Sequence, residues 1–301
     1  MVEKMVKVMI VGCGDLGGLV AKQLADLNIE TVGVRRSAIA IDGVKIIQAD
    51  VTQQASVDRL KEVQPEILIY CVAANGRNDE QYKSHYVDGL RYVLNTQVNN
   101  SHLKHVFFVS STRVYGQKSE ALINETIMAM PADFGGERLL EAENLLLSLP
   151  CNATTLRLSG IYGPGRLRMI NLAKSPDSWP KENSWSNRIH RDDAAAFMVY
   201  LVQKVLTNDA VDNCYIVTDS EPTTQHEVLH WIAAQLGIAF SELAPVIEGG
   251  KRLCNQTMLA TGFKLQYPDF RAGYQALLNQ EADIQNTAIQ NAKKVTSTKY
   301  V

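Results

Sequence analysis

The sequence has few of the features that mark secreted or membrane proteins. Its five cysteines are odd in number, far apart and never in C-x-x-C spacing, so a disulfide framework is not expected. No apolar run approaches the length of a membrane span, and the first residues lack the apolar core of a signal peptide. We therefore expect a cytoplasmic protein without membrane contact.

An excess of charge of either sign is also missing. The chain has 30 lysines and arginines against 32 aspartates and glutamates, a formal net charge of -2 at pH 7. Such a balance offers no basic surface for nucleic acid. With 301 residues, 46% of them hydrophobic, the chain can build one large or two modest domains. We therefore expect neither nucleic acid nor an anionic membrane as a partner.

A glycine-rich stretch, VKVMIVGCGDLGG at residues 6–18, is the strongest motif. Its first half is a β-branched apolar run typical of a buried strand, and apolar side chains at helical spacing follow the turn. The turn fits G-x-G-x-x-G, whose glycines permit a sharp bend, close approach of a diphosphate and tight helix packing. The alternative is a turn that binds nothing, but the flanking strand and helix favour a dinucleotide. The residues expected to hold the diphosphate are Gly12, Gly14, Asp15, Leu16 and Gly17.

Strand and helix signals alternate along the chain, which is typical of an α/β fold with a doubly wound parallel sheet. Between the strands lie helical patterns, the longest at about residues 79–100. The expected strands after the first are residues 29–34, 44–48, 66–72, 104–109, 153–158 and 214–218.

The second expected strand ends at Arg35 and Arg36. A dinucleotide fold usually places an acidic residue there to hold the ribose 2′-OH. A guanidinium instead suits the 2′-phosphate of NADP, because it pairs with phosphate through parallel charge-assisted hydrogen bonds. The alternative is that both arginines are solvated loop charges. We expect NADP as the cofactor, with NAD as the second choice.

Residues at two further strand ends are expected to line the same site. Asp50 and Val51 follow the third strand, and Asp50 either caps the next helix together with Thr52 or faces the adenine amino group. Ala73 and Ala74 follow the fourth strand, where small side chains leave room for a ligand.

Four segments together resemble the extended short-chain dehydrogenases/reductases, and the NAD-dependent epimerase/dehydratase family of sugar-nucleotide enzymes most of all. They are the glycine motif, HVFFVSSTRVYG at residues 105–116, LRLSGIYGPGR at 156–166 and RIHRDDAAA at 188–196. The resemblance implies a dinucleotide-binding Rossmann domain followed by a smaller C-terminal substrate domain. The implied boundaries are 1–160 for the first, to which about 189–218 return, and 161–188 with 219–280 for the second. Residues 281–301 are polar and are expected to form a loose tail.

The resemblance also implies the catalytic groups. In such enzymes a Ser or Thr after the fifth strand hydrogen-bonds the substrate oxygen, a Tyr acts as acid and base, and a Lys holds the nicotinamide ribose. Ser111 matches the first role, with Ser110 beside it, and Ile161 is expected next to the nicotinamide. The Tyr and Lys positions hold Phe134 and Arg138.

Phe134 has no titratable proton, and losing a general acid typically costs on the order of a hundredfold to ten-thousandfold in rate. Arg138 can still hold ribose hydroxyls as a fixed cation. Tyr86, Tyr115 and Tyr162 are the tyrosines placed well enough to substitute, although packing is the default role for Tyr115.

Two functions therefore stay open. The first is an NADP-dependent epimerase, dehydratase or reductase that acts on a sugar nucleotide or a related carbonyl or hydroxyl compound. It uses Ser111 with a non-standard proton donor or water. The second is a catalytically weak module that senses NADP(H). Either is expected as a monomer or homodimer, and the sequence does not name the substrate.

Two other patterns are weaker. His226 to His230 fits the zinc motif H-E-x-x-H, but the surrounding fold places it on an expected exposed helix, so no metal site is expected. Asp192 and Asp193 precede an alanine-rich helix, where carboxylates stabilise the N-terminus.

Overall fold

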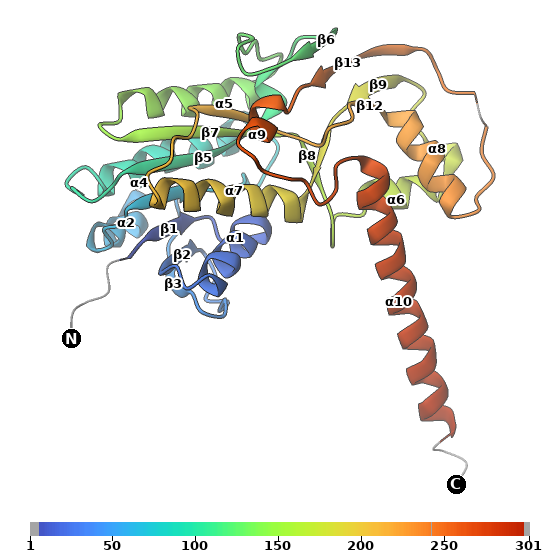
Figure 1. Ribbon diagram of the computed structural model, residues 1–301, viewed down its shortest axis with the longest axis horizontal. Coiled ribbons are helices and arrows are strands. Elements are labelled where there is room, and N and C mark those ends of the chain that lie inside the picture. The colour runs from blue at the N-terminus through green and yellow to red at the C-terminus, as the bar shows by residue number, and fades with distance from the viewer. Residues whose placement is uncertain (1–5, 242, 298–301) are drawn as a thin grey trace.

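A seven-stranded parallel sheet forms the centre of the molecule (Figure 1). The computed structural model describes residues 6–241 and 243–297. The sheet has the order β11-β7-β5-β4-β1-β2-β3, which confirms the doubly wound parallel sheet. Its strands are β1 (Val8–Val11), β2 (Thr31–Arg35), β3 (Lys45–Gln48), β4 (Ile67–Tyr70), β5 (His105–Ser111), β7 (Asn152–Leu158) and β11 (Cys214–Val217).

Helices cover both faces of this sheet. Along β1 the side chains alternate, so that Val8 and Ile10 pack toward α1 and α7 while Met9 and Val11 pack toward α4 and α5. All four residues are buried, as a strand covered on both faces requires. The helical segments are α1 (Asp15–Asp26), α2 (Gln54–Val57), η1 (Asp58–Glu62), α3 (Asp79–Tyr82), η2 (Lys83–Asp88), α4 (Gly89–Thr96), η3 (Thr112–Val114), α5 (Phe134–Leu145), η4 (Leu146–Ser148), α6 (Arg168–Ala173), η5 (Pro176–Ser178), α7 (Arg191–Leu206), α8 (Gln225–Gln235), α9 (Gln256–Ala260) and α10 (Phe270–Ser297).

The strand order reverses beside β1. The chain builds β2 and β3 on one side of β1 and then returns to place β4 on the other side. The two connections therefore leave the sheet in opposite directions and open a crevice at the carboxyl ends of β1 and β4.

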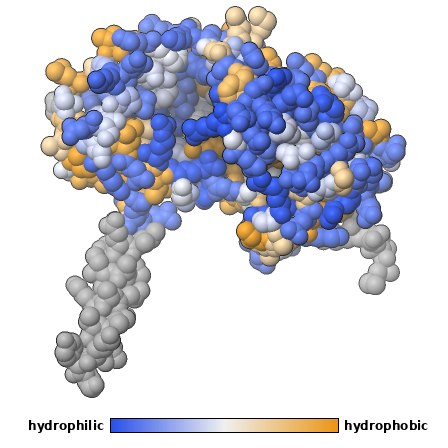
Figure 2. Space-filling model, turned by 180° about the vertical axis from the view of Figure 1, so that it is seen from behind, coloured by the Kyte–Doolittle hydropathy of each residue, from blue (hydrophilic) through white to orange (hydrophobic). Residues whose placement is uncertain are grey.

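A second lobe lies beside the sheet (Figure 1). Its apolar core joins α6, α8 and α10 through residues such as Ile170, Leu229 and Tyr274. Seen from behind, the surface is mostly hydrophilic and is hollowed between the two lobes (Figure 2). The remaining strands form a sheet of order β12-β9-β13-β6 and the pair β10-β8. They are β6 (Ser119–Ile123), β8 (Gly160–Tyr162), β9 (Asn183–Ser186), β10 (Arg188–His190), β12 (Thr223–Thr224) and β13 (Ile247–Leu253).

The expected loose tail is wrong as far as the described residues reach. Helix α10 continues through residue 297 and projects away from the body (Figure 1). Phe270, Tyr274 and Leu277 anchor its first turns in the second core, and the following Gln, Ala, Glu and Lys residues favour helix without forming an apolar stripe. No helix in the described part of the chain is long and apolar enough to cross a membrane.

A buried carboxyl, Asp219, lies at the junction of the two lobes. It is 1% exposed, and within the described residues neither of its side-chain oxygens has a hydrogen-bond partner. Burial raises the pKa of Asp219 to about 8, against the opposing attraction of the Arg188 guanidinium. The folded protein therefore holds a proton that the unfolded chain releases near pH 4.

The stabilisation from this proton is complete below the unfolded pKa and is lost as the pH rises through about 8. We expect the Asp219→Asn variant, which stays neutral, to gain unfolding free energy relative to the parent between pH 5 and 8. Linkage sets the gain at ~1.4 kcal/mol per pH unit. Denaturant unfolding at several pH values measures it, with the exposed Asp209→Asn as the control. If the parent, Asp219→Asn and Asp209→Asn showed the same dependence of unfolding free energy on pH, Asp219 would not hold a proton in the folded protein.

Candidate active site

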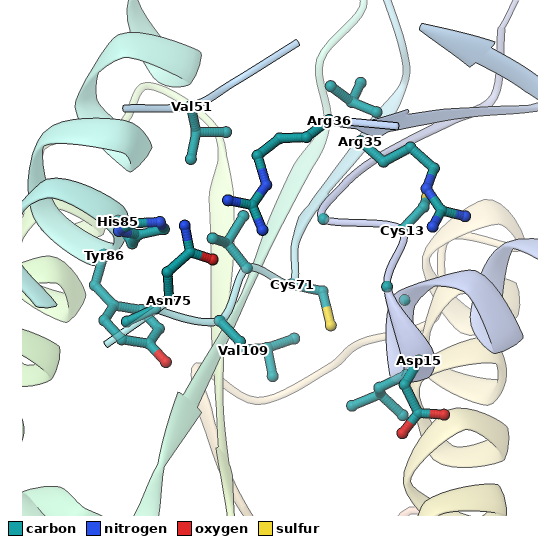
Figure 3. A pocket seen from close by; sticks show the side chains of 18 of the residues that line it. Cys13, Asp15, Arg35, Arg36, Val51, Cys71, Asn75, His85, Tyr86 and Val109 are labelled. Atoms are coloured by element: carbon teal, nitrogen blue, oxygen red, sulfur yellow. The ribbon is translucent and has the colours of Figure 1, made fainter. Parts of the chain in front are cut away.

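A cavity of about 810 Å³ occupies the crevice at the carboxyl ends of the central strands (Figure 3). Its size is within the range of small-molecule and cofactor sites. Fourteen of the residues expected from the sequence line it: Gly12, Gly14, Asp15, Leu16, Gly17, Arg35, Arg36, Asp50, Val51, Ala73, Ala74, Ser110, Ser111 and Ile161. Their binding roles stay predictions, but the fold brings them to one place.

The glycine turn has the geometry that a diphosphate requires. Gly12 has φ +100°, and a side chain there would overlap the carbonyl oxygen of Cys71 at the end of β4. A side chain at Gly17 would overlap the carbonyl oxygen of Gly12. At Gly14, by contrast, an added Cβ would meet no heavy atom within 4 Å. The turn therefore presents main chain and the start of α1 to open space, which fits a bound diphosphate.

One acidic side chain, Asp15, lies at the glycine turn. Arg166 donates to its Oδ2 at 2.6 Å, and Arg191 donates to its Oδ1 at 3.0 Å. Burial opposes ionisation of Asp15, but the two arginines outweigh it and hold the pKa of the carboxyl below its usual value. Because Arg166 also lines the cavity, a cation stands beside the expected position of the diphosphate.

The adenosine side of the cavity is formed after β2 and β3. Arg36 extends into the cavity, while Arg35 lies on the side of Cys13 (Figure 3). Oδ1 of Asp50 accepts from the main-chain N–H and the hydroxyl of Thr52, at 3.0 and 2.8 Å. The interpretation of Asp50 as a helix cap is wrong, because the next helix, α2, begins after Gln53 without a side-chain cap.

The opposite side of the cavity is formed after β4 and β5. Ser110 donates to Oε1 of Glu143 at 2.6 Å, so its hydroxyl is already engaged. Ser111 is half-buried, and its Oγ accepts from the main-chain N–H of Arg113 at 3.2 Å. The hydroxyl proton of Ser111 is therefore available to a substrate oxygen.

Phe134 and Arg138 are the two expected site residues that do not line the cavity. Phe134 begins α5 and packs edge-on against the ring of Tyr82, with the centroids 5.5 Å apart. Arg138 makes two hydrogen bonds to Asp79 and one, at 2.7 Å, to Glu141. The residue of α5 that lines the cavity is Leu139.

Tyr86 is the tyrosine among the possible substitutes that lines this cavity. It lies near Asn75 in Figure 3. Burial raises the pKa of the Tyr86 phenol, opposed by a hydrogen bond from the Ala74 N–H. Tyr115 instead accepts from Arg157, and Tyr162 is buried in the apolar core of the second lobe.

Sequence reasoning missed several cavity residues. His85 comes from η2, a π-helical turn within the long helical segment, and no periodicity in the sequence signals such a turn. Others are close neighbours of the expected strand ends in the chain. Including the residues on either side of each strand end would have found them. The missed residues are Cys13, Val34, Ser37, Ala49, Cys71, Val72, Asn75, His85, Val109, Leu139, Leu158 and Ser159.

A second cavity of about 360 Å³ is lined by Thr112, which follows Ser111 in the chain. Its charged lining residues are Arg113, Lys118, Lys251 and Asp133. Burial lowers the pKa of Lys251, whose ammonium donates to the main-chain oxygen of Tyr115.

The zinc-like motif takes part in packing. The expectation that its helix is exposed is wrong, since His226 is buried and its Nε2 lies 2.8 Å from the carbonyl oxygen of Pro180. Within the described residues, no group of three or more His, Cys, Asp or Glu side chains is arranged to hold a metal ion.

The carboxylates before the alanine-rich helix have separate roles. The N-cap of α7 is His190, whose Nδ1 accepts from the main-chain N–H of Asp192. Asp193 is buried and accepts from the main-chain N–H groups of Gln266 and Tyr267, at 2.8 and 2.9 Å. It therefore ties α7 to the segment that leads into α10.

Residues 8–213 match the family model described as the NAD dependent epimerase/dehydratase family. The chain belongs to this family. A structure from Methylobacillus flagellatus, described as a candidate NAD-dependent epimerase/dehydratase, is 45% identical to it. The match covers 93% of this chain and 100% of that one, with a TM-score of 0.85. The resemblance stated from the sequence is thereby confirmed.

More distant structures share the fold. The UDP-glucose 4-epimerase of Thermus thermophilus, in complex with NAD, is 18% identical with a TM-score of 0.70 and matches over 89% of this chain and 96% of that one. The Bordetella bronchiseptica enzyme WbmG, in complex with NAD and UDP, is 16% identical with a TM-score of 0.75 over 93% and 96%. No curated protein matches the chain.

A substitution at Gly14 can test cofactor binding without disturbing the fold. We expect Gly14→Ala to fold normally, since the added methyl group meets no protein atom. The methyl group would hold a diphosphate away from the main chain and weaken NAD and NADP binding roughly tenfold to a hundredfold, as lost charge-assisted hydrogen bonds do. Calorimetry measures the affinity and thermal unfolding the stability. In the comparison variant Gly17→Ala, stability itself should fall. Undiminished affinity in Gly14→Ala would place the diphosphate elsewhere.

Proposed function

We propose that this member of the NAD-dependent epimerase/dehydratase family carries out nicotinamide-dependent chemistry at a hydroxyl or carbonyl group of a sugar nucleotide or related compound. The observation that carries the proposal is one cavity that is lined by the glycine turn and also by Ser111 and Tyr86. A bound nicotinamide would accept or supply the hydride. The chain's own side chains would hold the substrate oxygen and move its proton.

Ser111 and Tyr86 are the proposed polar groups at the reacting oxygen. In the reductive direction the phenol of Tyr86 gives its proton to the substrate oxygen while the carbonyl carbon takes up hydride, and the Ser111 hydroxyl hydrogen-bonds the same oxygen. Burial raises the pKa of Tyr86, so its phenol is protonated at neutral pH, as a donor must be, but it releases the proton less readily than a free phenol does. Arg138 is committed to Asp79 and Glu141, which supports a proton route independent of a Tyr and Lys pair.

The substrate proposal draws support from the second cavity. Lys118 and Lys251 bring two positive charges, while Arg113 is paired with Asp133. Anionic oxygens, such as the phosphates of a sugar nucleotide, would complement these lysines. Thr112, which lines this cavity, follows Ser111 in the chain, which supports a substrate that extends from this cavity toward Ser111.

A panel of nucleotide sugars, incubated with NADP or NAD, tests the proposal through nicotinamide absorbance and product analysis. With a substrate that turns over, we expect Tyr86→Phe to lower kcat about a hundredfold or more, because it removes a general acid. Cofactor affinity should stay unchanged. Tyr92→Phe, a half-buried tyrosine outside both cavities, is the matched control. Full turnover by Tyr86→Phe would assign the proton to another group.

The proposed cofactor is NADP. Arg35 and Arg36 both line the cavity, and Arg36 is near enough to the Asp50 carboxylate to help lower its pKa. We expect Arg35→Asp to weaken NADP binding by at least about tenfold while NAD binding changes little, because only NADP carries the 2′-phosphate. Calorimetry with both dinucleotides, and with Arg59→Asp as an exposed arginine control, measures the difference. Equal losses for the two cofactors would remove the NADP assignment.

The second candidate is a module that binds NADP(H) with little or no catalysis. It is favoured by α5, which presents Leu139 to the cavity where a polar acid and base would otherwise be expected. Tight NADPH binding without oxidation across the substrate panel would support this module over the enzyme.

A further inference from the structure

Arg113 occupies a space that α5 leaves open at its first turn. Gly135 and Gly136 are buried there, although glycine destabilises a helix relative to alanine. A Cβ at Gly135 would lie 2.4 Å from Cζ of Arg113 and 2.6 Å from its Nη1. A Cβ at Gly136 would lie 2.6 Å from the main-chain oxygen of Arg113. The two glycines therefore make room for one arginine from η3, the turn that follows β5.

Side chains from α3 and from the start of α5 hold the guanidinium. Its Nε donates to both carboxylate oxygens of Asp133, the N-cap of α5, at 2.9 and 3.1 Å. Its Nη1 donates to the phenol oxygen of Tyr82 at 2.8 Å. Its Cζ lies 5.1 Å from the centroid of the Tyr82 ring and 5.4 Å from that of the Phe134 ring, within the range of cation–π contacts. The charge of Arg113 is therefore fixed in place and orientation.

Tyr82 connects Arg113 with Tyr86. The ring centroids of the two tyrosines lie 5.2 Å apart. Burial raises the pKa of the Tyr86 phenol, and Tyr82 and the Cys71 thiol act in the same direction. The phenol of Tyr70, from β4, is also near Tyr86. A main-chain N–H and the charge of Arg113 oppose the rise, so Arg113 is close enough to favour the phenolate form of Tyr86.

We propose that Arg113 is a positioning residue for proton transfer: it holds Tyr82 against Tyr86, and its charge stabilises the phenolate that forms when Tyr86 gives up its proton. The inference rests on the proposed role of Tyr86 as proton donor. When the substrate carbon takes up hydride from the proposed nicotinamide cofactor, the substrate oxygen takes the Tyr86 proton and leaves a phenolate behind. Burial penalises that charge, and a fixed guanidinium offsets the penalty because it stays protonated.

Fluorine NMR of protein labelled with 3-fluorotyrosine tests the inference without a substrate. Fluorine makes a phenol more acidic, so the titration midpoints move toward neutral pH. The variants Tyr86→Phe and Tyr92→Phe assign two of the signals. We expect the Tyr86 midpoint to rise by about half a pH unit or more in Arg113→Met, because the stabilising charge is gone. Arg113→Lys, which keeps a positive charge, should raise it less, and the Tyr92 midpoint should stay unchanged.

Chemical rescue tests the same role during turnover. With a substrate from the panel, Arg113→Ala should lower kcat about tenfold or more, because the phenol then gives up its proton less readily. Guanidinium ion at millimolar concentration should restore part of kcat by entering the vacated space, and it should not restore Tyr86→Phe. Arg59→Ala, at an exposed arginine, is the matched control and should keep full turnover.

The two measurements separate this inference from the proposed function. An equal Tyr86 midpoint in the parent and in folded Arg113→Met, or a Tyr86 signal that never titrates in the parent, would overturn the role of Arg113. A rise in KM with kcat unchanged would make Arg113 a substrate-binding residue instead. A parent that turns over no substrate would overturn the proposed function, while the NMR titration would still decide whether Arg113 acts on Tyr86.

Discussion

The close contact between the glycine turn and the end of β4 is the constraint on which the site depends. Gly12 lies against the carbonyl group of Cys71, and Gly17 lies against the carbonyl group of Gly12. Neither position has space for a Cβ, so the start of α1 is drawn down onto the point where the strand order reverses. The free main-chain N–H groups of the helix then open into the cavity, and the other walls are arranged around them.

Much of the central fold and of the cofactor cavity could be predicted from the sequence. Short apolar runs marked the parallel strands, and because parallel strands end at one edge of a sheet, the residues that follow them had to meet. The small sheet of the second lobe could not be found this way. It pairs β6 with β13, from residues 119–123 and 247–253, and most of β13 is exposed or half-buried, without clear alternation. Only the tertiary contact makes these segments strands.

The side of the cavity formed by α5 shows why spacing in the sequence does not by itself identify the residues that line the cavity. On a helix each residue turns the side chain by about 100°, so one step decides which side chain faces the cavity. The cap by Asp133 and the bonds from Arg138 to Asp79 fix the rotation of α5, and Leu139 is the residue that faces inward. The π-turn that presents His85 and Tyr86 likewise depends on Tyr70, a partner from another strand.

The ion pairs of Asp15 join the beginning of the chain to its second half. The aspartate belongs to the first βα crossover, whereas Arg166 and Arg191 are separated from it by 151 and 176 residues. On the ribosome, the crossover emerges well before either arginine has been made. The nascent N-terminal segment therefore carries a carboxylate without its partners at the glycine turn, and the ion pairs can form only after Arg191 has been synthesised.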